Sequence, residues 1–300
     1  MSFSESEVEV IEVISVEDLI KSWQSDFSVE TRHLFGSLKT IRMLRHRQSG
    51  IIFFDLPVLG DAAFYKTLRH FKWYHPSTKE EYRAAADWAR ADQMVLDVGA
   101  GLAGFADHVP KDRYIGLETD SEAVKDCRAR GLTVHNMDMA TYRAQSDVIS
   151  AGLVTAFQVL EHVDDPDGFI EQMGSLTQQG GRVAVGVPDA DSYVSDLPDF
   201  MLNAPPHHIT WWTEASLLAL MERQGLRPLE VKRFPVEPWE RQLWWMAKVA
   251  RIGRREGGSQ FGRNLRARKV VAYLVSYALQ LLPLPSDAMG STLFIIAEKE

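Results

Sequence analysis

The chain has 300 residues, of which 45% are hydrophobic and 25% are charged. This balance is typical of a folded globular protein and excludes a disordered or collagen-like chain. The net charge of −8 argues against a general nucleic-acid binder. The single cysteine, Cys127, excludes an internal disulfide and fits a reducing cytosol. The first thirty residues hold eight acids against Lys21, so we expect no signal peptide, and no apolar run reaches the roughly 18 residues of a membrane span.

The first 86 residues read as a mixture of short strands and helices. Residues 8–16 alternate acidic and apolar side chains, which predicts a strand, and Ser15 is placed to cap the helix that follows. The apolar stretches 41–44 and 51–54 flank the turn residues 48–50, which predicts a hairpin. Asp61 can begin another helix, and a further helix over about 80–90 leads into the middle of the chain.

The middle of the chain alternates strand and helix patterns. We expect strands at 94–98, 114–117, 133–135, 153–157 and 182–187, with glycines and a helix after the first and a helix over 121–130 after the second. Two later strands are expected at 229–234 and 292–297. This rhythm predicts an α/β fold in which helices cover both faces of a parallel sheet.

The sharpest motif is the glycine-rich loop after the first of these strands. Asp97, Gly99, Gly101 and Gly104 stand where a strand runs into a turn, and Glu118 ends the second strand 19 residues after Gly99. Glycines let a backbone approach a ligand closely, and a carboxylate at the second position can accept both hydroxyls of a ribose. The loop also contains G-x-G-x-x-G, so an NAD(P)-dependent oxidoreductase must be weighed. Asp97 argues against it, because a carboxylate there repels a diphosphate and favours the cationic methionine end of S-adenosylmethionine (SAM).

At this point the sequence resembles the class I SAM-dependent methyltransferases, over about 94–238 and the final strand. Residues 97–101 resemble their first motif, 114–118 the second, 136–139 the exit of the third strand, 157–166 the fourth motif of the small-molecule branch, and 180–188 the fifth strand. The resemblance implies a Rossmann-like sheet of seven strands whose last strand is antiparallel. It departs from the family at Ala103, where a third glycine is usual, but alanine is small enough that we expect binding to survive.

The resemblance also implies a role for each matching residue toward SAM as the cofactor. The residues fall into four sets: Asp97, Gly99 and Gly101 at the methionine end; Glu118 at the ribose; Asp138 and Met139 at the adenine; Gln158 and His162 near the transferred methyl group. His162 can instead fix its loop by packing and hydrogen bonding.

The segment 50–74, which includes Trp73 and Tyr74, resembles the N-terminal part of methyltransferases associated with sugars, polysaccharides and secondary metabolites. Some of those relatives have zinc-binding cysteines near the equivalent of 45–49, and this chain has none there. No set of residues shows metal-ligand spacing, so we expect no metal.

A hydroxyl acceptor is a poor nucleophile at neutral pH, and a base helps it. Residues 203–213 follow the fifth strand, at the open end of the sheet, and contain His207 and His208 ahead of Thr213, which can cap a helix. A Pro-Pro-His-His segment before a capped helix recurs in the family branch. We favour His208 as the general base and keep His207 open, and both can instead brace the loop.

Residues 239–289 form a basic insertion, with nine Lys and Arg residues against three acids, a net charge of +6. Tryptophans and apolar residues are interleaved with basic ones, including Arg254 and Arg255, which predicts two amphipathic helices. The insertion can be a helical cover or the face of a homodimer. It can also be a surface for anionic lipid or a lipid-linked glycan, which would place a cytoplasmic protein peripherally at the inner membrane face.

These observations predict four parts: an N-terminal α+β appendage (1–86), a SAM-binding core (87–238), a basic helical insertion (239–289) and a final strand of the core sheet (290–300). We expect methyl transfer from SAM to a small-molecule acceptor, an oxygen of a sugar or related metabolite. An NAD(P)-dependent oxidoreductase and a non-catalytic protein with the methyltransferase fold remain the alternatives.

Overall fold

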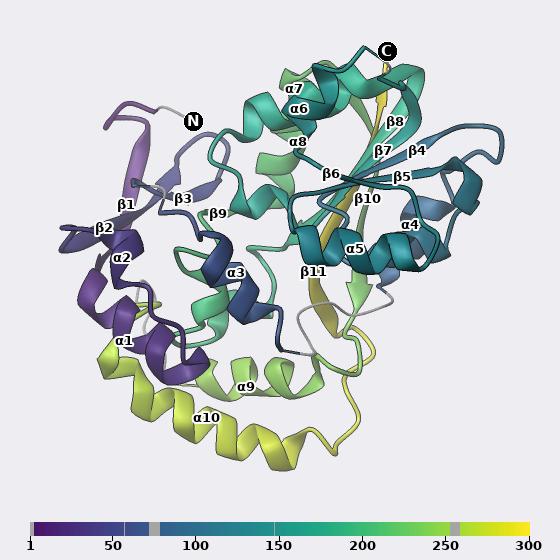
Figure 1. Cartoon of the computed structure of the whole chain (residues 1–300). Helices are drawn as coiled ribbons and strands as arrows, with labels where there is room; N and C mark the ends of the chain where they lie inside the picture. The colour runs from purple at the N-terminus through teal and green to yellow at the C-terminus, as the bar shows by residue number, and fades with distance from the viewer. Residues whose placement is uncertain (1–2, 57, 72–78, 147, 253–258) are drawn as a thin grey trace.

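The computed structural model describes residues 3–56, 58–71, 79–146, 148–252 and 259–300 (Figure 1). Trp73, Tyr74, Arg254 and Arg255, which the sequence analysis used, lie outside these residues.

A seven-stranded mixed sheet forms the centre of the molecule, in the order β10-β11-β8-β7-β4-β5-β6. Its strands are β4 (Val95–Val98), β5 (Tyr114–Glu118), β6 (Val134–Asn136), β7 (Ala151–Phe157), β8 (Thr177–Pro188), β10 (Leu226–Pro235) and β11 (Met289–Lys299). The first five run parallel, and β11 is antiparallel to both β8 and β10. The predicted Rossmann-like α/β sheet with an antiparallel last strand is therefore confirmed.

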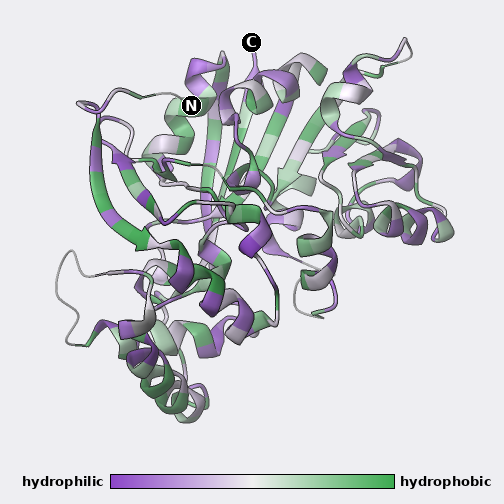
Figure 2. Ribbon diagram, turned by 60° about the vertical axis from the view of Figure 1, so that its left-hand side comes forward, coloured by the Kyte–Doolittle hydropathy of each residue, from purple (hydrophilic) through white to green (hydrophobic). Residues whose placement is uncertain are grey.

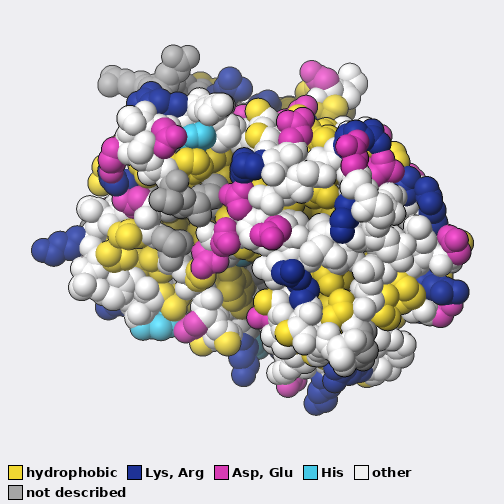
Figure 3. All heavy atoms as spheres, turned by 90° about the horizontal axis from the view of Figure 1, so that it is seen from above, with side chains coloured by type: hydrophobic (Ala, Val, Ile, Leu, Met, Phe, Trp, Pro, Cys, Tyr) yellow, Lys and Arg dark blue, Asp and Glu magenta, His cyan; other side chains and the backbone are white. Residues whose placement is uncertain are grey.

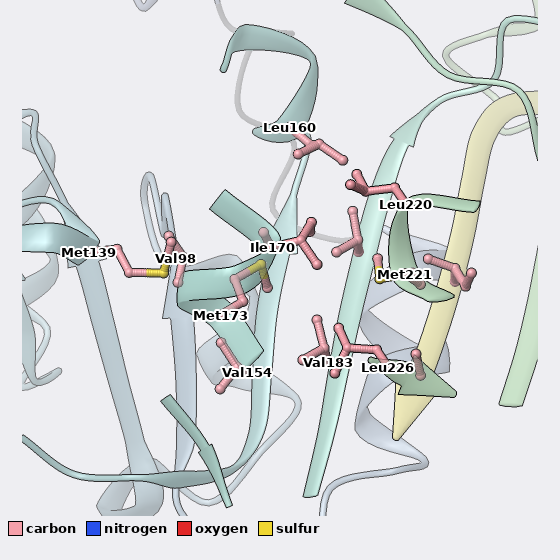
Figure 4. Close-up of a cluster of buried hydrophobic side chains, with 14 of the residues drawn as sticks. Val98, Met139, Val154, Leu160, Ile170, Met173, Val183, Leu220, Met221 and Leu226 are labelled. Atoms are coloured by element: carbon pink, nitrogen blue, oxygen red, sulfur yellow. The ribbon is translucent and has the colours of Figure 1, made fainter. Parts of the chain in front are cut away.

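The central strands are hydrophobic along most of their length because both faces are covered (Figure 2). One face packs against α6 (Met139–Arg143), α7 (Pro166–Leu176) and α8 (Glu214–Arg223), and Figure 4 shows part of this core. The other face packs against α4 (Glu80–Ala86) and α5 (Ser121–Ala129). Short 3₁₀ turns lie between elements along the chain: Gly104–Asp107, Lys111–Arg113, Leu160–His162, Tyr193–Asp196, Met201–Asn203 and Arg263–Leu265.

A second sheet, in the order β1-β2-β3-β9, lies beside the first. It contains β1 (Val8–Ser15), β2 (Thr40–His46), β3 (Ile52–Phe54) and β9 (Thr210–Trp211), and it is accompanied by α1 (Val16–Phe27), α2 (Arg32–Phe35) and α3 (Ala62–Leu68). The predicted hairpin is present as β2 and β3, and Ser15 and Asp61 cap α1 and α3 as expected. Because β9 comes from the segment after β8, the N-terminal sheet is completed by a distant part of the chain. The four-part division of the chain remains a prediction.

Trp23 anchors the N-terminal segment to the segment that carries the two candidate histidines. Its side chain is fully buried, and its indole N–H donates to the carbonyl of Pro205 at 2.8 Å. The ring also packs edge-on against Phe64. The N-terminal part of the chain therefore packs against the segment before His207 and fixes it through this hydrogen bond.

The basic insertion forms the two expected helices, α9 (Arg241–Arg251) and α10 (Arg266–Leu279), which pack together at the bottom of Figure 1. None of the described helices is long and apolar enough to cross a membrane. On the face seen in Figure 3, acidic and basic side chains are interspersed, so this face offers no uniform charge to a large ionic partner.

Candidate active site

The glycine loop takes the conformation that its glycines allow. Gly99 and Gly101 have φ of 69° and 54°, in the left-handed region that side chains disfavour. The N–H groups of Gly99 and Ala100 both donate to the carbonyl of Leu117, at 2.9 and 3.0 Å. A Cβ on Gly99 would lie 2.5 Å from a methyl carbon of Val159. The loop therefore packs directly on the segment that follows β7.

The prediction of a helix directly after the loop is wrong. The chain makes only a 3₁₀ turn, Gly104–Asp107, and Pro110 follows soon after. Ala103, at the position of the usual third glycine, is fully buried and has a φ of 52°, which breaks the right-handed helical path. Ligand contact at this end of the sheet therefore depends on the loop and not on the N-terminus of a long helix.

Glu118 lies against the loop, as the spacing predicted. Its Oε2 accepts the N–H of Gly101 at 2.7 Å. Its Oε1 accepts the N–H groups of Thr119 at 2.7 Å and Asp120 at 2.8 Å. These three bonds fix the orientation of the carboxylate at the carboxyl end of β5.

Asp97 lies beneath the loop and is only 3% exposed. The hydroxyls of Tyr114 and Thr155 each donate to one of its oxygens at 2.8 Å. Burial raises the pKa of Asp97 to about 6, although both hydroxyl bonds act in the opposite direction. The sequence indicated this carboxylate, but Thr155 could only be found from the pairing of β4 with β7.

The structure places the two residues assigned to adenine in different surroundings. Asp138 is exposed and caps α6 by accepting the N–H of Thr141 at 2.7 Å. The side chain of Thr141 and this backbone N–H both lower the pKa of the Asp138 carboxyl. Met139 is 4% exposed and belongs to the buried cluster of Figure 4, with Val98 and Leu160. The backbone at this point borders the end of β6, while the Met139 side chain faces the core.

Gln158 holds a buried polar group next to the loop. It has a φ of 57°, and its side-chain amide donates to Glu81 at 3.2 Å. Glu81 is 1% exposed and lies 3.4 Å from the ammonium of Lys79. Burial raises the pKa of Glu81, and the nearby ammonium opposes that shift. Sequence analysis did not identify Lys79 or Glu81. They come from the start of α4 and the residue before it, and Glu81 lies 77 residues before Gln158 in the chain.

The main result at the site is a histidine cluster. His162 follows β7, whereas His207 and His208 lie 45 and 46 residues later, and the structure brings all three rings together. The rings of His207 and His208 are stacked with centroids 4.4 Å apart, and His162 meets them edge-on at 4.7 and 4.9 Å. One ring nitrogen of each lies within 4.8 Å of the others. The sequence showed no metal-ligand spacing because the two segments meet only in the fold.

Backbone and side-chain acceptors define the tautomer of each histidine. The Nδ1 atoms of His162 and His207 face the carbonyls of His207 and Leu202, at 2.5 and 2.8 Å. A carbonyl only accepts, so both Nδ1 atoms carry the proton. Burial lowers the pKa of His162 to about 4 and holds those of His207 and His208 well below their usual value. All three rings are therefore neutral at pH 7.

Glu161 is the cluster member that sequence reasoning missed. It is 1% exposed, and neither carboxylate oxygen has a hydrogen-bond partner among the residues the structure describes. Its Oε1 lies 3.8 Å from Nε2 of both His162 and His208. Burial raises the pKa of Glu161 to about 8. The only signal in the sequence was its position beside His162 after a buried strand.

Comparisons with known proteins agree with this geometry. A family model described as a methyltransferase domain matches residues 71–231, more than half of the chain. A Mycolicibacterium smegmatis protein named as a probable S-adenosylmethionine-dependent methyltransferase is 28% identical over 206 residues, 68% of this chain and 75% of that protein. A 37.1 kDa protein in transposon TN4556 of Streptomyces fradiae, named as uncharacterized, is 31% identical over 133 residues. That match covers 41% of this chain and 38% of the relative.

Two solved structures show the same fold. A SAM-dependent methyltransferase from Archaeoglobus fulgidus has a TM-score of 0.53 at 17% identity, covering 78% of this chain and 100% of that one. A Thermotoga maritima methyltransferase, described as a possible histamine N-methyltransferase, has a TM-score of 0.50 at 16% identity. The match covers 79% of this chain and 97% of that one. With the matched domain, the glycine loop beside Glu118 and the strand order, these findings establish that the chain belongs to the class I SAM-dependent methyltransferases.

Proposed function

We propose that the protein transfers the methyl group of SAM to a hydroxyl oxygen of a small molecule, a sugar or a related metabolite. The observation that carries the proposal is the contact between the cofactor loop and the segment of the histidine cluster. Gly99 packs on Val159, and His162 lies three residues further along the same turn. A donor bound at the loop therefore lies next to groups that can accept a proton.

In this proposal the loop and its neighbours hold the cofactor. Gly99 and Gly101 let the backbone approach the methionine end, and Asp97 supplies negative charge beneath it. Glu118 holds the ribose hydroxyls, and residues 138–139 border the adenine. Gln158 and His162 shape the space around the methyl group.

The reaction is a displacement at the methyl carbon. A bond forms between the acceptor oxygen and the methyl carbon as the carbon–sulfur bond breaks, and its electron pair stays on sulfur to give S-adenosylhomocysteine. The hydroxyl proton goes to a neutral imidazole, His208 or His207. A neutral ring at pH 7 is the form that can take this proton, and burial maintains that form.

A hydroxyl acceptor fits this site better than a carboxylate. A carboxylate needs no base, whereas a hydroxyl can make use of the neutral imidazole of His207 or His208. The likeness of the N-terminal segment to methyltransferases associated with sugars and polysaccharides supports a sugar-like acceptor.

The test is transfer of radioactive methyl from SAM into a fractionated small-molecule extract. We expect label in a hydroxyl-bearing product with the wild-type protein. Of His207→Gln and His208→Gln, the variant that removes the base should reduce kcat by about 10²-fold or more while leaving binding of S-adenosylhomocysteine intact. His70→Gln, which alters an exposed histidine in the turn after α3, is the control. Unchanged turnover in both His207→Gln and His208→Gln would contradict the base role.

We also propose peripheral membrane contact through α10. The small residues Ala272 and Ser276 are buried, while the large apolar residues of α10 point to solvent. The exposed set is Val270, Val271, Tyr273, Leu274, Val275, Tyr277, Leu281 and Leu282. In Figure 2 the lowest helix carries hydrophobic residues interrupted by hydrophilic ones. Exposed apolar surface of this extent, with tyrosines at its edge, suits the boundary between lipid headgroups and acyl chains.

The basic residues of the insertion contribute less to lipid contact than the sequence indicated. Lys269 pairs with Asp26, Arg268 donates to the carbonyl of Ala250, and Arg241 donates to the carbonyl of Gln280. Arg268 and Arg241 join α9 to α10, and Lys269 ties α10 to α1. Because these three cations are engaged within the protein, we expect the apolar face to supply most of the proposed membrane affinity.

Flotation of the full chain with anionic and with neutral vesicles tests this contact. We expect the protein to float with vesicles and Leu274→Asp to reduce the floating fraction several-fold. Val13→Asp, at an exposed apolar position on β1, is the matched control. Failure to float, with a dimer in light scattering that Leu274→Asp dissociates, would show that a second copy covers α10 instead.

A further inference from the structure

The histidine cluster has a second property that base catalysis does not use. Glu161 and His162 come from the 3₁₀ turn after β7, and His208 comes from the segment before β9. All three are largely withdrawn from solvent, with the His162 side chain the most accessible at 19%. The rings of His162, His207 and His208 form one cluster, and the Glu161 carboxylate lies 3.8 Å from two of them.

The rings present the right atoms for coordination. Nδ1 of His162 is bound to the carbonyl of His207 at 2.5 Å, and Nδ1 of His208 lies 3.2 Å from Oδ1 of Asn203. In both rings the proton is on Nδ1, so Nε2 carries a lone pair. Metal-binding histidines commonly have this arrangement, in which an oxygen acceptor fixes the ring and its tautomer.

Both lone pairs face the same carboxylate. Oε1 of Glu161 is 3.8 Å from each Nε2, too far for a hydrogen bond. Two atoms that each lie about 2.1 Å from one metal ion are roughly 3.4 Å apart in tetrahedral geometry and at most about 4.2 Å apart. The observed separations fall within that span.

Glu161 is also the buried group that most needs a partner. It is 1% exposed, and both of its oxygens lack a hydrogen bond among the described residues. Burying a carboxylate without a partner is costly, and a bound cation removes that cost. A proton can neutralise the group as well, but a protonated carboxyl offers one O–H donor to two facing histidine lone pairs, and at 3.8 Å both are beyond hydrogen-bond distance.

We propose that Nε2 of His162, Nε2 of His208 and the carboxylate of Glu161 bind a divalent transition-metal ion such as Zn²⁺. Two imidazoles and one carboxylate suit ions of this class, and three protein ligands leave coordination positions open. The inference goes beyond methyl transfer and does not depend on it. A nitrogen that binds an ion cannot also take a proton, so metal binding leaves His207 as the remaining histidine of the candidate pair for the base.

The test is calorimetric titration of Zn²⁺ into the full-length, tag-free protein after dialysis against a chelator. We expect one ion per chain, and at least about tenfold weaker binding in Glu161→Gln and His208→Gln. His70→Gln controls for binding by an exposed histidine and should match the wild-type protein. Substituting Co²⁺ gives a second readout, a visible absorption band that the same two variants lose.

His162→Gln is the third variant. His162 is the most accessible of the three ligands, so this substitution is expected to disturb folding least. Circular dichroism and the midpoint of denaturant unfolding verify that each variant is folded, and neither requires the metal. Weaker Zn²⁺ binding in His162→Gln and Glu161→Gln supports the site. Absence of a Zn²⁺ site in the wild-type protein, or equal affinity in the wild-type protein and both of these variants, overturns it.

Discussion

Replacing Gly99 by alanine tests how the cofactor loop packs on the turn after β7. Two separate costs follow from the structure. The φ of 69° places alanine in the left-handed region, at roughly 1–2 kcal/mol. The new Cβ would lie 2.5 Å from a Val159 methyl, and forced repacking of this kind costs about 1–3 kcal/mol. We therefore expect Gly99→Ala to lower the free energy of unfolding by about 2–5 kcal/mol. Where the loop shifts to avoid the contact, the cost appears instead as weaker binding of the cofactor.

Gly131 offers a matched control for the backbone cost alone. It has a φ of 78°, and nothing lies within 4 Å of a Cβ added there. Gly131→Ala should therefore lose only the first 1–2 kcal/mol or so. The difference between the two variants isolates the contact with Val159.

Denaturant unfolding and titration of S-adenosylhomocysteine measure both variants. Combining Gly99→Ala with Val159→Ala removes the methyl that the new Cβ would meet, so the two changes should be strongly non-additive. In that background Gly99→Ala should cost about as much as Gly131→Ala. Additive effects, or equal losses in the two single variants, would refute the proposed contact.

Three further predictions concern Asp97, Ala103 and Trp23. Burial raises the pKa of Asp97 to about 6, so its contribution to stability is present at low pH and is lost as pH rises through 6. The free energy of unfolding of the wild-type protein, measured relative to that of Asp97→Asn, should rise by roughly 1 kcal/mol from pH 8 to pH 5. SAM affinity of the wild-type protein should fall below pH 6. Unfolding free energies of the two proteins that change in parallel between pH 8 and pH 5 would contradict this. Ala103→Gly should gain a few tenths of a kcal/mol in denaturant unfolding, because the residue has a φ of 52°; a loss would argue against that backbone. Trp23→Phe leaves the Pro205 carbonyl without its donor and should cost about 1–3 kcal/mol in the same assay, whereas an unchanged midpoint would show that water replaces the bond.

Local patterns carried most of the information about the sheet. Strands such as β4 and β7 are short apolar runs, and buried parallel strands must be apolar on both faces. The glycine loop and Glu118 could be found together because a close backbone approach limits which residues fit. The helix after the loop could not be excluded, because the left-handed turn falls on Ala103, and alanine is ordinarily a strong helix former.

The histidine cluster depends on contacts between distant segments. His162 and His208 were each identified, but their meeting around Glu161 follows from the tertiary packing that places β9 beside β3. The same holds for Lys79 and Glu81, whose buried charges lie against Gln158. Spacing along one sequence carries no information on such pairs.

The most direct measurement is calorimetric titration of the wild-type chain and of Glu118→Ala with S-adenosylhomocysteine and, separately, with NAD⁺. We expect one S-adenosylhomocysteine per wild-type chain, affinity at least tenfold lower in Glu118→Ala, and no heat with NAD⁺. Tight NAD⁺ binding, or no binding of S-adenosylhomocysteine by the folded wild-type protein, would contradict the assignment of this loop to a sulfonium nucleoside.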